Sequence, residues 1–402
     1  MAKTQKKTGY PTSGATKSGQ SPLPGQVVLV LQGGGALGAY QAGVYQALHE
    51  AGMEPDWVIG TSIGAINAAL MAGNPPTQRL ERLRTFWNSV EQNAGTDVSA
   101  FCPPALASAV VNWMTLTTGI PSFFAPNPMA WLAQYAPVGI EHAAYYSTAP
   151  LRETLAQLVD MDYLNARHMR ISLGAVKITS GEMRYFDSRQ EPIAMAHILA
   201  SGALPPAFPA IRVNDDFYWD GGIYSNTPIE AVLDDNPRRD SLIFAVDVWN
   251  AHGPLPESLW QVAGKEKDIQ YASRANSHIA RQKQIHHLRH VILELVKTLP
   301  DPLRESPAVK ELASWGCQTT MHVARIAAAN IDGEDQLKDI DFTPAHIQAR
   351  WSAGYADARR MLELAPWTQP VDPVEGIIIH DLVADEVTSR VEGVDGFQGK
   401  SK

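Results

Sequence analysis

The feature that most constrains the fold is an apolar run that leads through a cluster of glycines into a helical pattern. Residues 27–43 read VVLVLQGGGALGAYQAG, in which Gly33, Gly34, Gly35 and Gly38 follow a β-branched run. Such an order is typical of a strand, a tight turn and a helix in succession. Strand and helix patterns continue to alternate along the chain, and this alternation favours an α/β sheet domain. The predicted strands lie at residues 27–31, 56–60, 169–178 and 241–248.

Composition and the pattern of apolar residues divide the chain into three parts. Residues 1–25 are rich in Ser, Thr, Gly, Pro and Lys without a signal-peptide core, and they predict a disordered tail. Residues 26–250 carry the α/β pattern, with a proline- and tryptophan-rich insertion at about 100–147 that we expect to cover the sheet. Residues 251–402 predict a mainly helical C-terminal extension with one strand at 376–380.

Composition excludes several classes of protein. Lys and Arg number 33 and Asp and Glu 42, so the formal net charge is −9 and we expect no nucleic-acid partner. The cysteines, Cys102 and Cys317, lack disulfide or zinc spacing and fit a reducing compartment. No stretch reaches the roughly 18 consecutive apolar residues that a membrane span needs. We therefore expect a soluble, cytoplasmic protein.

The glycine turn has two interpretations. Gly33, Gly35 and Gly38 match G-x-G-x-x-G, which in a dinucleotide-binding unit cradles a pyrophosphate. That unit needs an acidic residue at the far end of the next strand, but here Asp56 opens that strand. The alternative is that the amides of Gly33 to Gly35 form an oxyanion hole, which requires a nucleophile nearby.

A serine in a nucleophile motif follows the second predicted strand. Gly60-Thr61-Ser62-Ile63-Gly64 matches G-x-S-x-G, and it stands between a strand and a helix, where a sharp turn lifts a serine hydroxyl clear of a sheet. Gly60 and Gly64 allow that turn to be tight. A serine that only caps a helix is the competing interpretation. The combined context favours Ser62 as a nucleophile.

Three residues are candidates for the base that the serine needs. Asp220 precedes Gly221 and Gly222 in the stretch FYWDGGIYSNTP, although Asp-Gly is also a common turn signal. Asp247 is another acid, but it sits inside a predicted strand. His197 is a possible histidine base, although no histidine stands in a recognisable motif. Asp220 is the preferred base.

These blocks, in this order, resemble those of the patatin-like phospholipases. The G-G-G-x-x-G turn at 33–38, GTSIG at 60–64, ASGALPPAFPAI at 200–211 and the Asp-Gly-Gly at 220–222 carry the resemblance, which covers about residues 26–250. It implies a three-layer α/β/α hydrolase that cleaves lipid acyl esters with a Ser-Asp dyad and needs no metal or other cofactor. Ser62 would be the nucleophile, Asp220 the base and the 33–38 turn the oxyanion hole.

The sequence departs from the family pattern at one position. Many members carry Lys or Arg just before the last glycine of the first block, where this chain has Leu37. Without that cation, a neutral glyceride or simple ester becomes a credible substrate beside a phospholipid or lysophospholipid. Two other functions stay open: a Ser-His-Asp carboxylesterase, and a non-catalytic lipid-binding protein that retains the fold.

The helix predicted at 272–299 raises a separate question about membranes. Its apolar stripe contains Leu288 and Leu295, and its polar side carries Arg289 with the pair His286 and His290. A histidine pair four residues apart can hold a metal, but a solvated helix face is the favoured interpretation. As a basic amphipathic helix, it is also a candidate contact with a lipid surface through Arg281, Lys283 and Arg289.

Overall fold

A computed structural model describes residues 23–92, 104–253, 255–329, 331, 336–372, 374–383 and 386–390 of the chain. The predicted tail at 1–25 and Cys102 therefore lie almost wholly outside the described residues. Within them, ten strands form one sheet in the order β12-β11-β10-β9-β1-β2-β5-β8-β7, with β6 on β5. The strands are β1 Gln26–Leu31, β2 Trp57–Thr61, β5 Arg170–Lys177, β6 Glu182–Asp187, β7 Ile211–Val213, β8 Asp216–Asp220, β9 Ser241–Asp247, β10 Met321–Ala327, β11 Ile377–Val383 and β12 Glu386–Arg390. The predicted strands are confirmed as β1, β2, β5, β9 and β11.

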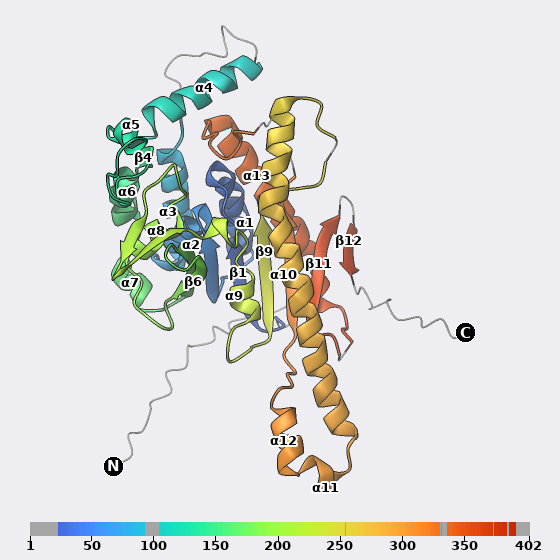
Figure 1. Cartoon of the computed structure of the whole chain (residues 1–402). Helices are drawn as coiled ribbons and strands as arrows, with labels where there is room; N and C mark the ends of the chain where they lie inside the picture. Colours follow the sequence, from blue (N-terminus) through green and yellow to red (C-terminus); the bar gives the residue numbers. More distant parts are fainter. Residues whose placement is uncertain are drawn as a thin grey trace, which may run out of the picture.

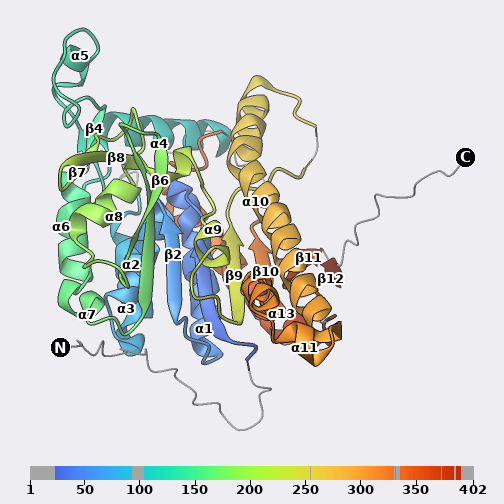
Figure 2. The same ribbon diagram turned by 60° about the horizontal axis from the view of Figure 1, so that its bottom comes forward.

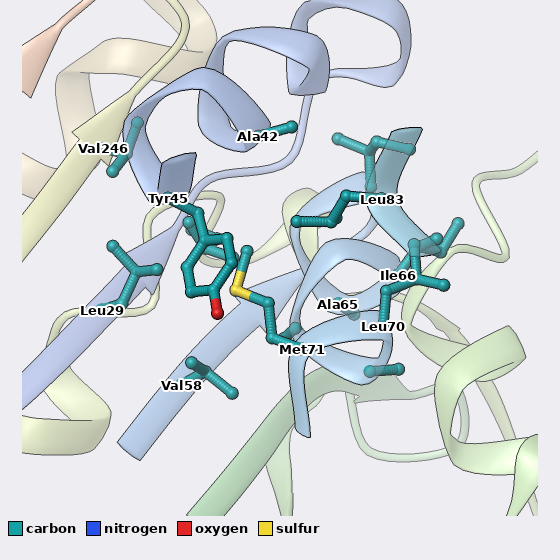
Figure 3. Packing of buried hydrophobic residues seen from close by; sticks show 14 of the residues in the cluster. Leu29, Ala42, Tyr45, Val58, Ala65, Ile66, Leu70, Met71, Leu83 and Val246 are labelled. Atoms are coloured by element: carbon teal, nitrogen blue, oxygen red, sulfur yellow. The ribbon is translucent and has the colours of Figure 1, made fainter. Parts of the chain in front are cut away.

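Helices cover both faces of the sheet, which confirms a three-layer arrangement (Figure 1). Side chains alternate along β1: Leu29 and Leu31 pack with α1 (Ala39–Glu50) and α2 (Ile63–Ala72), whereas Val28 and Val30 face α9 (Glu230–Leu233). Figure 3 shows the first of these layers, with Leu29 and Val58 of the sheet beneath Ala42, Tyr45 and Met71. The other helices are α3 Pro76–Ser89, α4 Pro104–Thr118, α5 Ala130–Ala133, α6 Ala149–Leu158, α7 Met161–Asn165, α8 Met195–Ser201, α10 Leu259–Thr298, α11 Asp301–Arg304, α12 Pro307–Ala313 and α13 Pro344–Leu364.

The central strands place the glycine turn at a reversal point of the sheet. β1 lies between β2 and β9 and runs parallel to both. The chain leaves β1 toward β2 on one side, while the next parallel strand on the other side is β9. Ligands of open α/β sheets bind beyond the carboxyl ends of the strands at such a point. The loops after β1 and β2 therefore meet where a substrate is expected.

The C-terminal region adds strands to this same sheet. β10 pairs with β9 in parallel, and β11 pairs with β10. α13 crosses α1 with close backbone contact: a Cβ on Gly43 would stand 2.0 Å from the carbonyl oxygen of Trp351, and one on Gly354 would stand 2.0 Å from that of Tyr40. The sheet is therefore continuous across the boundary near residue 250, and the division at that residue stays a prediction about folding units.

The long helix α10 exists as predicted, but its buried side differs from the prediction. Leu288 and Leu295 are exposed, whereas His286 and His290 are buried. The imidazole Nε2 atoms of His286 and His290 lie 3.3 and 3.0 Å from the carbonyl oxygens of Leu233 and Thr319. The prediction of a solvated histidine face was wrong, because both rings are buried and each Nε2 meets a backbone carbonyl in the interior. In the described part of the chain no group of three or more His, Cys, Asp or Glu side chains could hold a metal ion.

The insertion forms a layer at the end of the molecule where the β1 and β9 strands finish. It contains α4, the short strands β3 (Ala125–Pro126) and β4 (Tyr146–Ser147), and α5 (Figures 1 and 2). Its interior is aromatic, with edge-on contacts that join Phe123, Phe124, Phe208 and Tyr146. No helix among the described residues is both long enough and apolar enough to cross a bilayer.

Candidate active site

Ser62 occupies a strained turn between β2 and α2. Its backbone φ is 57° and ψ is −125°, a conformation that a residue with a side chain rarely adopts. The turn is tight because a Cβ on Gly60 would stand 2.3 Å from the carbonyl oxygen of Gly64, and one on Gly64 would stand 2.3 Å from that of Leu31. Both flanking glycines are therefore required, as the motif predicts, and Ser62 is raised from the sheet.

A second serine anchors the backbone of this turn. The Ser62 N–H lies 3.1 Å from both the carbonyl oxygen and the Oγ of Ser201, at the end of α8. The Ser201 hydroxyl in turn donates to the carbonyl oxygen of Gly174 at 2.6 Å. The stretch 200–211 was recognised from the sequence without a role. Its one serine, Ser201, holds the strained turn, while Leu204 and Phe208 line the cavity described below.

Asp220 ends β8 and is buried with one oxygen unsatisfied. Its Oδ1 accepts the Gly222 N–H at 2.7 Å. Its Oδ2 is buried and has no hydrogen-bond partner among the described residues. Burial raises the pKa of the Asp220 carboxyl from 3.8 to about 7, against the opposing effects of the Ser62 hydroxyl and the Gly222 N–H. A carboxylate with a free lone pair and a pKa near neutrality has the properties of a general base.

The glycine turn after β1 is held through the carbonyl group of Gly33, and this leaves the N–H groups of Gly34 and Gly35 free. The Gly33 carbonyl oxygen accepts two hydrogen bonds, from Asn226 Nδ2 at 3.0 Å and from the Trp249 indole N–H at 2.7 Å. Because a trans peptide places its C=O and N–H on opposite sides, this anchoring turns the Gly34 N–H the other way. Within the described residues the Gly34 and Gly35 N–H groups have no acceptor.

The N–H of Gly33 is engaged, unlike those of Gly34 and Gly35, and this corrects the predicted set of oxyanion donors. Its own N–H donates to the carbonyl oxygen of Asn226 at 3.1 Å, so it is occupied within the fold. Gly35 has a φ of +53°, and a Cβ there would stand 2.2 Å from the carbonyl oxygen of Asp339, which also accepts the Ala36 N–H. The turn therefore offers two free amides, those of Gly34 and Gly35, rather than three.

These groups meet at one end of an apolar cavity. Ser62, Asp220 and the turn at residues 33–35 line it together with aromatic and aliphatic side chains. The apolar part includes Leu116, Phe124, Tyr146 and Phe208 from the insertion side and Tyr271, Ile340 and Phe342 from the C-terminal region. No Lys, Arg or His is among the described lining residues, and Asp339 adds a second carboxyl. The cavity is therefore suited to a hydrocarbon chain next to the serine.

The C-terminal region also supports the glycine turn from behind. The Trp249 ring packs at a tilt on Tyr271 of α10, with the ring centres 4.8 Å apart, and the Lys338 ammonium lies 5.4 Å from the Trp249 ring centre. Lys338 is itself fixed by a buried ion pair with Asp268 at 2.7 Å. Sequence reasoning missed Asn226 and Trp249. Asn226 stands close to the Asp-Gly-Gly motif, but nothing in the local sequence marks Trp249.

The other residues that the sequence analysis considered for the site have structural roles. His197 is buried, accepts the Ala194 N–H at 3.0 Å and stacks at 4.3 Å on Phe186, and it does not line the cavity. Asp247 ends β9 and pairs with Arg325 at 3.0 Å. Asp56 accepts the Val27 N–H at the start of β2, and Leu37 is part of the core.

Comparisons with known proteins identify the family of the chain. Residues 29–233 match the family model described as patatin-like phospholipase, and residues 269–374 match a second model described as patatin phospholipase. The chain is 35% identical over 91 residues to the triacylglycerol lipase ptl3 of Schizosaccharomyces pombe. The matched stretch spans 23% of this chain and 18% of that protein. It is 61% identical over 46 residues to the lysophospholipase nte1 of Aspergillus terreus, over 11% of this chain and 3% of that protein. The chain thus spans less than a fifth of each curated relative.

Solved structures with a similar arrangement share little sequence with this chain. VipD from Legionella pneumophila is 15% identical with a TM-score of 0.38, over 87% of this chain and 69% of that one. The type III effector ExoU is 14% identical with a TM-score of 0.31, over 85% and 54%. The first family model covers about half of the chain and contains the serine turn, the glycine turn and Asp220. The chain belongs to the patatin-like phospholipase family.

Proposed function

We propose that the protein is a serine acyl hydrolase that cleaves carboxylic esters of lipids with a Ser62–Asp220 dyad. The observation that carries the proposal is the unsatisfied Oδ2 of Asp220, buried beside the strained Ser62 turn at the end of an apolar cavity. A buried polar atom without a partner calls for an explanation, and accepting the Ser62 proton supplies one.

In the first half of the reaction, Ser62 Oγ attacks the ester carbonyl carbon as its proton passes to Asp220 Oδ2. The carbonyl oxygen becomes an oxyanion and accepts the N–H groups of Gly34 and Gly35. When the intermediate collapses, the bond to the leaving oxygen breaks and Asp220 returns the proton to that oxygen. An alcohol departs, and the acyl group stays on Ser62.

In the second half, water attacks the acyl carbon and gives a proton to Asp220. The second intermediate collapses with release of the carboxylic acid, and the proton on Asp220 returns to Ser62 Oγ. The cycle uses no metal or other cofactor. The fixed backbone turn at Ser62 keeps its Oγ in place through both halves, first as a hydroxyl and then as the ester oxygen.

We further propose that uncharged lipid esters are preferred over phospholipids of the same acyl length. Leu37 stands where a cation is usual, and the described cavity lining holds two carboxyl groups and no cation. Triacylglycerol and lysophospholipid, named for the two curated relatives, are the natural first substrates to compare. A phospholipid preference above about tenfold in kcat/KM, which corresponds to roughly 1.4 kcal/mol, would contradict this proposal.

The test is hydrolysis of a matched panel of glycerides, phospholipids, lysophospholipids and soluble nitrophenyl esters. Ser62→Ala is the blank, and labelling by a fluorophosphonate measures whether Ser62 is nucleophilic. We expect labelling of the wild type and none of Ser62→Ala. Unlabelled wild-type protein that still binds lipid would instead favour the non-catalytic lipid-binding function.

A further inference from the structure

One long segment of the chain is almost without charge. Between Asp97 and Arg152 the sequence contains a single charged side chain, Glu141. This segment includes the insertion with α4 and α5. Surface segments of ordinary proteins carry many charges, so an uncharged stretch of this length calls for a physical reason.

Large apolar side chains on this segment face the solvent. Trp113 on α4 is 64% exposed, and Trp131 on α5 is 69% exposed. The start of α10 shows the same property, since Leu259 is 86% exposed and Trp260 is 59% exposed. Exposed apolar surface of this extent marks a site of contact with a partner or a membrane.

The three elements lie at one end of the molecule. α4, α5 and the first turns of α10 are found together at the end toward which β1 and β9 run, and both views agree on this (Figures 1 and 2). The cavity opens at the same end: Leu116 of α4 lines it and is also 40% exposed. We call these exposed parts of α4, α5 and residues 255–262 the rim surface. It adjoins the cavity that contains Ser62 through Leu116, which belongs to both.

We propose that the rim surface docks on a lipid surface without net charge and delivers the ester directly into the cavity. This proposal rests on the proposed function, because it names the physical form in which the substrate is met. Exposed tryptophan next to aliphatic side chains is the composition that partitions into a membrane interface.

Charge argues for an uncharged lipid surface rather than an anionic one. The two lysines near the rim surface are engaged: Lys265 donates to the carbonyl oxygen of Ala251 at 2.6 Å, and Lys267 pairs with Asp339 at 3.0 Å. The basic residues that the sequence suggested as a lipid contact are Arg281, Lys283 and Arg289, and the first of them lies about 33 Å along α10 from Leu259 at roughly 1.5 Å per residue. A lipid contact through these three residues would therefore lie away from the rim surface.

The experiment measures flotation of the full chain with vesicles of phosphatidylcholine. A triple variant, Trp113→Ser, Trp131→Ser and Trp260→Ser, removes three exposed rings that do not line the cavity. The matched control is Trp315→Ser, which removes a ring that is 67% exposed just after α12, at the far end of the α10 hairpin. All variants carry Ser62→Ala so that the lipid stays intact.

We expect vesicle binding of the triple variant to be at least about tenfold weaker, with Trp315→Ser unchanged. Equal binding of the triple variant, no binding of the wild type, or binding that requires phosphatidylserine and vanishes in salt would overturn the proposal. A dimer that the triple variant loses, measured by sedimentation without lipid, would assign the rim surface to a second copy instead.

Activity separates this proposal from the proposed function. With Ser62 restored, the triple variant should hydrolyse a monomeric soluble ester as fast as the wild type, and an emulsified glyceride at least about tenfold more slowly. A wild type that hydrolyses neither ester overturns the proposed function, while the flotation result still decides on the rim surface. Equal loss on both substrates would mean that the rings support the fold, and it would overturn the docking proposal.

Discussion

The buried carboxyl of Asp220 should weaken the fold at alkaline pH, and Asp220→Asn should remove that effect. Burial raises the pKa of Asp220 from 3.8 to about 7. The folded chain therefore keeps this proton between about pH 4 and pH 7, whereas the unfolded chain releases it. Because the folded state binds more protons in that window, the contribution of Asp220 to the free energy of unfolding falls as pH rises from 4 to 7. Above pH 7 the loss is complete.

The size of the effect follows from the difference of about three pKa units. At about 1.36 kcal/mol per unit, ionised Asp220 costs the fold up to roughly 4 kcal/mol at pH 8. An amide at this position carries no charge at any pH, so the variant escapes this cost. We expect Asp220→Asn and the wild type to differ little at pH 4.5, and the variant to be more stable at pH 8.

The assay is urea unfolding of both proteins at pH 4.5 and pH 8, followed by circular dichroism. Ser62→Ala is the control, since it abolishes catalysis but keeps the carboxyl and should show no such gain at pH 8. Asp220→Asn should at the same time lose nearly all ester hydrolysis, because an amide cannot accept the Ser62 proton. If Asp220→Asn is less stable than the wild type by the same amount at both pH values, ionisation of Asp220 does not destabilise the fold and the reasoning fails.

Further predictions concern pH, the glycine turn and the histidine alternative. kcat/KM on an uncharged soluble ester should rise with pH and reach half its maximum near pH 7, the pKa of Asp220 in the free enzyme, and a flat profile from pH 5 to 8 would contradict a base of this kind. Trp249→Phe removes one of two donors to the Gly33 carbonyl and keeps the ring, so kcat should fall about tenfold with little change in KM, whereas an unchanged kcat would show that Asn226 suffices. His197→Ala should keep more than about a tenth of the wild-type kcat/KM but unfold at lower urea, because it loses the stack on Phe186, and an inactive, folded His197→Ala would reopen the search for a triad.

The parts of the site that could be predicted from sequence are those fixed by a few adjacent residues. The Ser62 turn depends on Gly60 and Gly64, whose contacts with Leu31 and with each other are set by the strand-turn-helix geometry. Asp220 could be found for the same reason, since Gly222 supplies its nearest hydrogen bond. Local sequence therefore carries the identity of the groups that we propose to react.

What could not be predicted depends on contacts between distant segments. The occupied N–H of Gly33 is explained by Asn226, which is far away in sequence. The buried face of α10 was predicted wrongly because the periodicity of its sequence shows an apolar stripe. In the fold, two histidines on another face are buried against the carbonyl oxygens of Leu233 and Thr319. No pattern within the helix reveals those carbonyls, so periodicity favoured the wrong side.

The same long-range contacts make the C-terminal region part of the proposed catalytic site. The proposed oxyanion loop is fixed at Gly33 by Trp249 and at Ala36 by the carbonyl of Asp339. Trp249 packs against Tyr271 of α10, and Asp339 is tied to α10 through its ion pair with Lys267. A displacement of α10 would therefore move both anchors of the loop together. Because an oxyanion donor acts only when it is already in position, the accuracy of the Gly34 and Gly35 amides depends on how rigidly α10 is docked.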